Sequence, residues 1–186
     1  MTRYTSVAIA LHWAIALVIL CNLALGLYMT GLPLSAGPIK LKLYAWHKWA
    51  GVSVFALVLV RVLWRLTHTP PPPPAGTAPW QRIGASAAHS ALYVLTLAVP
   101  LTGWLFSSAK GFQTVWFAVL PIPDLLARDP LLAELLRGWH ASLNYAMLAL
   151  VILHVAAALK HQWIDRDTVM ARMLPFLSPP SGAKTP

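Results

Sequence analysis

The sequence predicts an all-α integral membrane protein, a four-helix bundle with both termini in the cytoplasm. Of the 186 residues, 58% are hydrophobic and only 10% are charged, whereas a soluble domain carries about 25% charged residues. Four apolar stretches are each long enough to cross a hydrocarbon core of about 30 Å. Lysine and arginine gather at the ends of these stretches, where they anchor lipid headgroups. These three observations exclude a soluble globular domain.

The four apolar stretches are free of aspartate and glutamate. The predicted spans cover residues 7–28, 44–66, 84–106 and 138–160. Because backbone groups in lipid must pair internally, stretches of this length and continuous apolar character should be helices. We therefore expect one four-helix domain over residues 1–175. The tail that follows, residues 176–186, is rich in proline and serine and is predicted to be disordered.

The connections between the spans differ in length and composition. Five consecutive prolines, Pro70 to Pro74, exclude a helix between the second and third spans and predict a short extended linker. The longest connection, residues 110–137, is rich in aromatic residues and also contains prolines. We expect it to lie at the membrane interface as a lid, with a short helix over residues 129–137.

Charge predicts the orientation and excludes one class of partner. With the N-terminus inside, eight lysines and arginines fall on the inner side and six on the outer side, which favours a cytoplasmic N-terminus. A net charge of +9 would suggest nucleic acid for a soluble protein. Here the charges lie at the span ends, so we expect membrane lipid and no nucleic acid. The basic excess on the outer side either attracts an anion or anchors lipids.

Every span carries histidine, a residue that is costly in a bilayer and usually functional there. In the fourth span His140 and His154 are fourteen positions apart, which returns to nearly the same helix face about 21 Å further along the axis. By depth, His12 and His154 share an inner layer, while His47 and His140 share an outer layer. His89 lies in the inner layer as a third histidine.

Two facing imidazoles on neighbouring helices are what a b-type haem requires. With both axial positions filled, such a haem transfers electrons and leaves no position open for dioxygen. Cys21 is the only cysteine, so no covalent haem attachment motif exists. The absence of carboxylates inside the spans disfavours a metal transporter. The remaining alternative is that the histidines bond only to backbone groups or to one another.

Three further residues lie on the same helix faces as the histidines. Gly51 is one turn from His47, and Gly103 is fourteen positions from His89; they either make room for a porphyrin or pack helices together. Arg61 lies fourteen positions after His47, at the inner end of its span. It is a candidate for binding an inner haem propionate or a quinone headgroup, and the alternative is contact with lipid phosphate.

Short motifs surround these histidines, and two other patterns accompany them. They are Ala10-Leu11-His12-Trp13, Trp46-His47-Lys48-Trp49-Ala50-Gly51, Trp139-His140, Leu153-His154-Val155-Ala156-Ala157-Ala158, Tyr93…Pro100…Gly103 and Arg172-Met173-Leu174-Pro175. Together with the proline-rich linker, they resemble the bacterial cytochrome b561 family over about residues 3–175. The resemblance implies two non-covalent b haems in the bacterial inner membrane. Carried over by position, His12 and His154 would hold the inner haem, and His47 and His140 the outer one, as depth also indicates.

The resemblance also implies a function. Short, stand-alone members include a superoxide oxidase, which takes electrons from superoxide at the periplasmic side through two b haems and delivers them to ubiquinone. Similar cytochrome b subunits relay electrons between the quinone pool and a periplasmic dehydrogenase or another periplasmic electron donor. The third hypothesis is a non-catalytic haem carrier or a quinone-binding structural protein.

Candidate catalytic residues follow for the superoxide oxidase hypothesis. A basic outer rim would steer superoxide by its charge. This rim consists of Lys40, Lys42, Lys48, Lys110 and Arg137. At the inner side, His89 and His161 are candidates for binding and protonating the quinone, because histidine titrates near neutral pH. The alternatives are a hydrogen bond within the bundle for His89 and a solvated helix end for His161.

Overall fold

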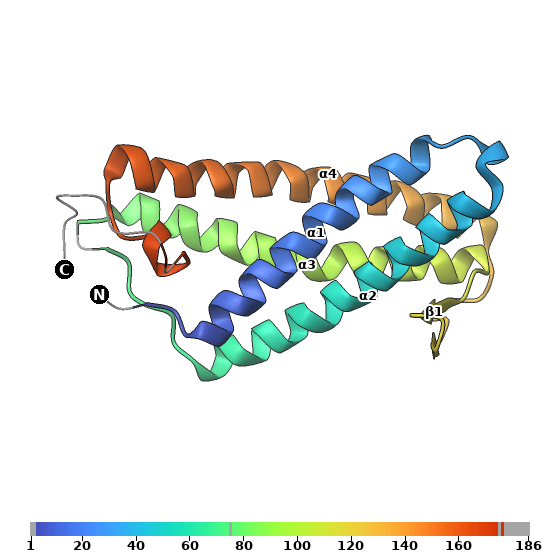
Figure 1. Cartoon of the computed structure of the whole chain (residues 1–186), viewed down its shortest axis with the longest axis horizontal. Helices are drawn as coiled ribbons and strands as arrows, with labels where there is room; N and C mark the ends of the chain where they lie inside the picture. The colour runs from blue at the N-terminus through green and yellow to red at the C-terminus, as the bar shows by residue number, and fades with distance from the viewer. Residues whose placement is uncertain (1–2, 75, 175, 177–186) are drawn as a thin grey trace.

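The computed structural model describes residues 3–74, 76–174 and 176, and it confirms the predicted four-helix architecture. In this part of the chain four helices are long and apolar enough to cross a membrane. They are α1 (Ser6–Gly31), α2 (Gly37–Thr67), α3 (Pro79–Lys110) and α4 (Pro130–Lys160). They run up and down in sequence order, so that α1 begins at the same end of the molecule at which α4 finishes (Figure 1). That this end faces the cytoplasm stays a prediction.

Local sequence signals explain where the helices begin and end. The Thr5 hydroxyl accepts a hydrogen bond from the Ala8 amide at 3.2 Å and caps α1. Asp129 caps α4 in the same way, accepting from the Leu131 and Leu132 amides at 3.0 Å. Helix α3 stops at Gly111, whose φ of 80° lies in the left-handed region that glycine adopts without strain.

The predicted short helix over residues 129–137 is wrong as a separate element. These residues form the N-cap and the first two turns of α4, which continues without a break to Lys160. These turns contain polar and charged residues, so the apolar stretch in the sequence begins only at residue 138. The helix itself begins earlier, at Pro130. A helix that extends beyond the hydrocarbon core into the headgroup region keeps its hydrogen bonds but loses its apolar signature.

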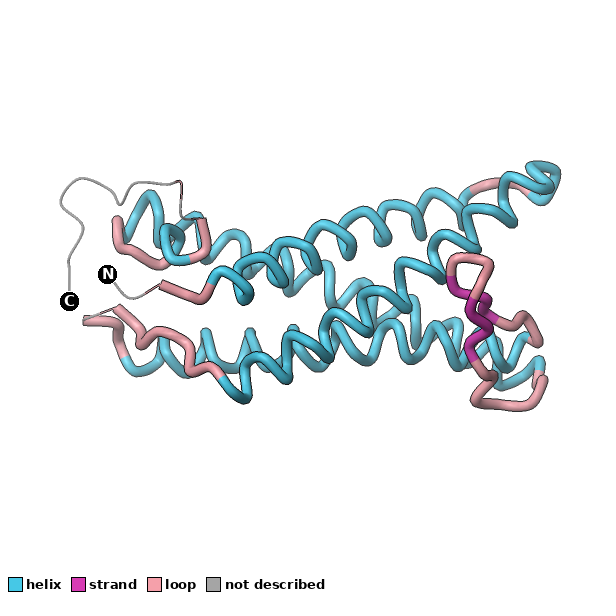
Figure 2. The backbone as a smooth tube through the Cα atoms, turned by 60° about the horizontal axis from the view of Figure 1, so that its bottom comes forward, coloured by secondary structure: helices cyan, strands magenta, loops and turns pink. Residues whose placement is uncertain are grey.

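The rest of the outer connection forms a β-hairpin that the sequence did not predict. Strands β1 (Thr114–Trp116) and β2 (Leu120–Ile122) pair antiparallel, and Figure 2 shows them at the opposite end of the bundle from the start of α1. The Trp49 indole donates to the Val115 carbonyl oxygen at 2.6 Å. The Trp116 indole donates back to the Ser53 hydroxyl at 3.2 Å. The hairpin is therefore docked against α2, close to His47.

The proline-rich linker and the segment after α4 both lie at the inner end. Residues 68–74 contain no regular secondary structure, as the prolines predicted. After α4 the chain forms a short π-helix, η2 (His161–Asp165), and a short 3₁₀ helix, η3 (Met170–Arg172). The Trp13 indole donates to the Met173 carbonyl oxygen at 2.9 Å, which ties this segment to α1. The predicted disordered tail lies outside the described residues, apart from residue 176.

Packing between the helices is uneven. The closely packed pairs of long helices are α1 with α2, α2 with α3 and α3 with α4. A small buried cluster of Ile15, Val54 and Val58 lies between the inner and outer histidine layers. Helix α4 does not pack closely against α1 or α2 in the described structure, although it carries a histidine that faces each of them.

Candidate functional site

Two pairs of histidines face each other across the bundle, at two depths. In the outer layer, His47 of α2 faces His140 of α4 with ring centroids 6.1 Å apart and an interplanar angle of 90°. In the inner layer, His12 of α1 faces His154 of α4 with centroids 6.2 Å apart and an angle of 64°. These are the pairs that depth along the sequence predicted, and the two separations agree within 0.1 Å.

This separation fits an iron atom held between the two rings. If a metal ion is bound by one nitrogen from each ring, with metal–nitrogen bonds of about 2.0–2.1 Å, the two ring centroids are roughly 6 Å apart. The helices that carry each pair are not closely packed against each other, so their backbones leave space for a planar group. Both observations agree with a haem slotted edge-on between helices.

Hydrogen bonds orient the outer pair. His47 Nδ1 lies 3.2 Å from the Asn22 carbonyl oxygen, and His140 Nδ1 lies 3.0 Å from the Val99 carbonyl oxygen. A carbonyl oxygen only accepts, so each Nδ1 carries the hydrogen. The lone pair then resides on Nε2, which is free to bind a metal. Metal-binding histidines are commonly oriented in this way, and the donor set of the outer pair fits a bis-histidine haem.

Two glycines let the outer imidazoles approach the neighbouring helices. A Cβ atom on Gly26 would lie 3.1 Å from His47 Cε1, and one on Gly103 would lie 3.0 Å from His140 Cε1. The sequence singled out Gly103 but related it to His89, and it singled out Gly51, where a Cβ would meet nothing within 4 Å. Gly26 was missed, although it lies fourteen positions after His12. The signal that could have identified Gly26 is this fourteen-residue spacing, which also separates the two histidines of α4.

The inner layer contains three histidines. The ring centroid of His89 lies 5.4 Å from that of His154, with an angle of 67° between the rings. This is closer than either facing pair, and therefore less suited to hold a metal between the rings. The structure thus places His89 beside the inner pair, as the sequence predicted, and leaves His12 as the better partner of His154.

Arg61 lies at the inner end beside this layer. Its Nε donates to the Tyr93 hydroxyl at 3.1 Å, and one terminal nitrogen donates to the Ala8 carbonyl oxygen at 2.8 Å. It lines a pocket between the start of α1 and the end of α2 whose described lining holds arginines but no acid. His68, which the sequence analysis did not consider, also lines this pocket and stacks on Trp64 at 3.8 Å.

The predicted basic rim lies at the outer end, and part of it is paired. Glu134 accepts from Lys110 at 3.3 Å and from Arg137 at 2.7 Å, so two cations share one carboxylate. Lys48 donates to the Phe112 carbonyl oxygen at 2.9 Å, which does not neutralise its charge. The rim therefore keeps a positive excess, although its candidate catalytic residue Lys110 is paired with Glu134.

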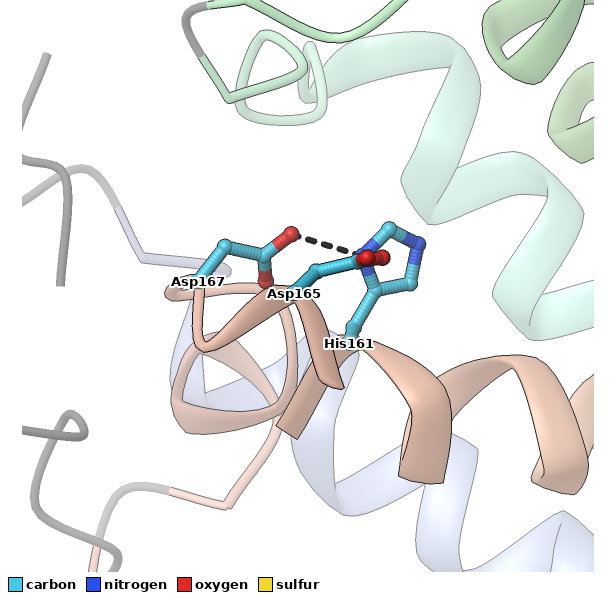
Figure 3. Close-up of side chains that lie close together, drawn as sticks. All are labelled: His161, Asp165 and Asp167. Carbon is cyan, nitrogen blue, oxygen red and sulfur yellow. Dashed lines mark hydrogen bonds and ion pairs between the residues drawn. The ribbon is translucent and has the colours of Figure 1, made fainter. Parts of the chain in front are cut away.

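His161 lies apart from the histidine pairs, at the end of α4, in a cluster with two aspartates (Figure 3). Its Nδ1 is 2.6 Å from Asp167 Oδ2 and 3.4 Å from Asp165 Oδ2. Asp165 is also bound by Lys160 at 2.6 Å. Asp167 is therefore the main partner of His161, and Asp165 mainly neutralises the lysine.

Comparison with known proteins identifies the family. The family model of prokaryotic cytochrome b561 matches residues 3–176. The chain belongs to the prokaryotic cytochrome b561 family. Cytochrome b561 homolog 2 of Escherichia coli (strain K12) is 34% identical over 172 residues, which cover 92% of this chain and 91% of the relative. Cytochrome b562 of Cereibacter sphaeroides is 30% identical, over 92% of this chain and 94% of the relative.

A more distant relative carries a more specific name. A probable superoxide oxidase, CybB, of Yersinia pestis is 24% identical, over 93% of this chain and 96% of the relative. Membership of the cytochrome b561 family, together with four membrane-crossing helices, makes this chain a multi-pass protein of the bacterial inner membrane. The family implies that it binds haem b and transfers electrons.

Proposed function

We propose that this cytochrome b561 oxidises superoxide at the outer membrane surface and reduces ubiquinone, with two b haems between these substrates. The observation that carries the proposal is the presence of two histidine pairs of equal separation, 6.1 and 6.2 Å, at two depths of one bundle. One pair would serve a single redox centre in one leaflet. Two pairs divide the membrane thickness into shorter electron-transfer steps.

Four histidines and one arginine would hold the cofactors. His47 and His140 would hold the outer haem, and His12 and His154 would hold the inner haem. When bound, each haem would carry one electron at a time. Arg61 lies beside the inner pair and is available to a propionate carboxylate, to which a guanidinium binds strongly.

At the outer surface the chain would collect a small anion. The positive excess of the rim attracts superoxide and raises the rate of encounter. Two superoxide anions each lose one electron and leave as dioxygen, and ubiquinone gains these two electrons and two protons to become ubiquinol.

At the inner surface the chain would supply protons to the quinone. His161 is hydrogen-bonded to Asp167, and a histidine held by a carboxylate is a candidate general acid for the quinone. His89 lies beside His154 and is the second candidate for a hydrogen bond to the quinone. The Yersinia pestis relative supports the superoxide assignment by its name, at 24% identity.

Rapid-mixing optical spectroscopy tests the proposal. Purified, oxidised protein is mixed with superoxide, with and without a short-chain ubiquinone. We expect rapid reduction of a bis-histidine b-type spectrum, followed by reoxidation only when quinone is present. The absence of any haem spectrum would overturn the proposal as a whole.

The alternative function is an electron relay between the quinone pool and a periplasmic dehydrogenase or carrier. One observation favours it: the outer hairpin exposes Phe117, Val119 and Leu120, with 55%, 83% and 51% of their surfaces accessible. Such an apolar surface suits either the membrane interface or a docked partner. A spectrum that quinol reduces but superoxide leaves unchanged would favour the relay over the superoxide oxidase.

A further inference from the structure

The inner end of the bundle contains a buried arginine that no part of the proposed electron path uses. Arg172, in η3, is only 6% exposed. Its neighbours Thr168 and Ala171 are 1% and 0% exposed, so this part of the short segment is buried. Arginine is almost never buried to this extent without a partner for its charge.

The described residues supply no counter-ion for Arg172. One terminal nitrogen donates to the Pro72 carbonyl oxygen in the linker, and Nε has no hydrogen-bond partner among the residues that the structure describes. The two acids of the same segment are engaged elsewhere, Asp167 by His161 and Asp165 by Lys160. A buried guanidinium with an unsatisfied N–H is costly. The arrangement therefore points to an anion that the described residues do not supply.

The position of Arg172 indicates which anion this is. The Trp13 indole bonds to the Met173 carbonyl oxygen at 2.9 Å, which joins the residue after His12 to the residue after Arg172. Both inner histidines lie six residues from a helix end, His12 after Ser6 and His154 before Lys160. Six residues of helix correspond to about 9 Å along the axis. The segment therefore lies at the end of the bundle where α1 begins and α4 finishes (Figure 1), and the inner histidine pair lies about 9 Å inside this end.

We propose that Arg172 binds an oxyanion, namely the propionate carboxylate of the haem held by His12 and His154. The inference rests on the proposed two-haem function. A guanidinium matches a carboxylate with two parallel hydrogen bonds, and Nε is available for one of them. A positive charge beside the inner haem also favours its reduced form, so Arg172 would raise its reduction potential. A lipid phosphate presents the same chemistry and is the other source of the anion.

Redox titration of single-haem proteins tests the assignment. The variants Arg172→Gln, Arg172→Lys and Arg166→Gln are each made in a His47→Ala background, in which we expect only the inner haem to remain. Arg166 is the matched control, because it is an exposed arginine in the same segment. In nanodiscs of zwitterionic lipid we expect Arg172→Gln to lower the inner-haem potential, Arg172→Lys to lower it less, and Arg166→Gln to leave it unchanged.

Native mass spectrometry of the same proteins separates the two sources of the anion. If Arg172→Gln releases a tightly retained anionic phospholipid while the inner-haem potential stays unchanged, the propionate assignment is overturned. If neither the potential nor the retained lipid changes, no anion binds at Arg172. If the Arg172→Gln protein does not accumulate, the Arg172→Lys protein is used for the test, because lysine keeps the positive charge but lacks the planar guanidinium group.

The wild-type protein distinguishes failure of the inference from failure of the proposed function. A wild-type spectrum that lacks a second haem would overturn the two-haem proposal and this inference with it. Two haems in the wild type, together with an inner potential that does not respond to Arg172→Gln, would overturn the inference alone.

Discussion

At the scale of single residues, the two histidine pairs differ in how the chain orients them. Both outer histidines donate through Nδ1 to backbone carbonyl oxygens of neighbouring helices. In the inner pair no such hydrogen bond is found among the described residues, and His89 packs beside His154 instead. The outer rings are therefore oriented by the fold itself, whereas the inner rings depend more on the group that they bind.

The first prediction concerns the ligand assignment. We expect His47→Ala and His140→Ala each to remove the outer haem and leave the inner haem, because each deletes one of the two histidines proposed to hold the outer haem. Pyridine haemochrome analysis should then give about one haem per chain instead of two. Loss of both haems from either variant, or of neither, would contradict the pairing by depth.

The second prediction concerns the glycine beside His140. The Cβ atom of a Gly103→Ala variant would lie 3.0 Å from His140 Cε1, so the imidazole must move. Overpacking of this kind costs about 1–3 kcal/mol, which corresponds to roughly 5- to 150-fold weaker retention of the outer haem. Haem transfer to apomyoglobin measures this retention. Gly51→Ala is the control, because its Cβ would meet nothing within 4 Å; equal effects of the two variants would exclude a specific role for Gly103.

At the scale of elements, helix geometry explains how much of the site the sequence could predict. The fourteen-residue spacing places His140 and His154 on one helix face at two different depths. Because the span boundaries give the depth of the other histidines, the sequence was sufficient to predict the two layers. The hairpin at β1 and β2 did not follow, because its strands are three residues each and are held by tryptophan contacts with α2. Such contacts join residues more than sixty positions apart, which no local pattern records.

The third prediction concerns the π-helix after α4. Asp167 is the 2.6 Å partner of His161, so Asp167→Asn should remove the carboxylate that holds the His161 ring in place. We expect reoxidation of the haems by ubiquinone to slow by about tenfold or more, while their reduction by superoxide stays unchanged. Asp165→Asn is the matched control, because Asp165 mainly pairs with Lys160. Equal slowing by both variants would point to loss of the π-helix rather than to proton transfer.

At the scale of the whole molecule, the two ends of the bundle are both basic but differ in how their charges are arranged. At the outer end the cations lie around an open rim and share a single glutamate, Glu134, between Lys110 and Arg137. At the inner end, arginines line a pocket, and Arg172 is buried. Exposed charges act on diffusing ions and are screened by salt, whereas buried ones act on bound groups. The outer end is therefore suited to collecting an anion and the inner end to holding one.

The last prediction follows from this difference. If the outer rim steers superoxide, the second-order rate of haem reduction should fall by about tenfold as the ionic strength rises from about 0.01 to 1 M, because the screening length shrinks from about 30 to 3 Å. Glu134→Gln removes the carboxylate shared by Lys110 and Arg137, so it should raise this rate at low salt. Rapid mixing at a series of salt concentrations measures both effects. Reduction by a neutral donor of similar size should show neither dependence, and a salt-independent rate with superoxide would mean that the rim only anchors lipid headgroups.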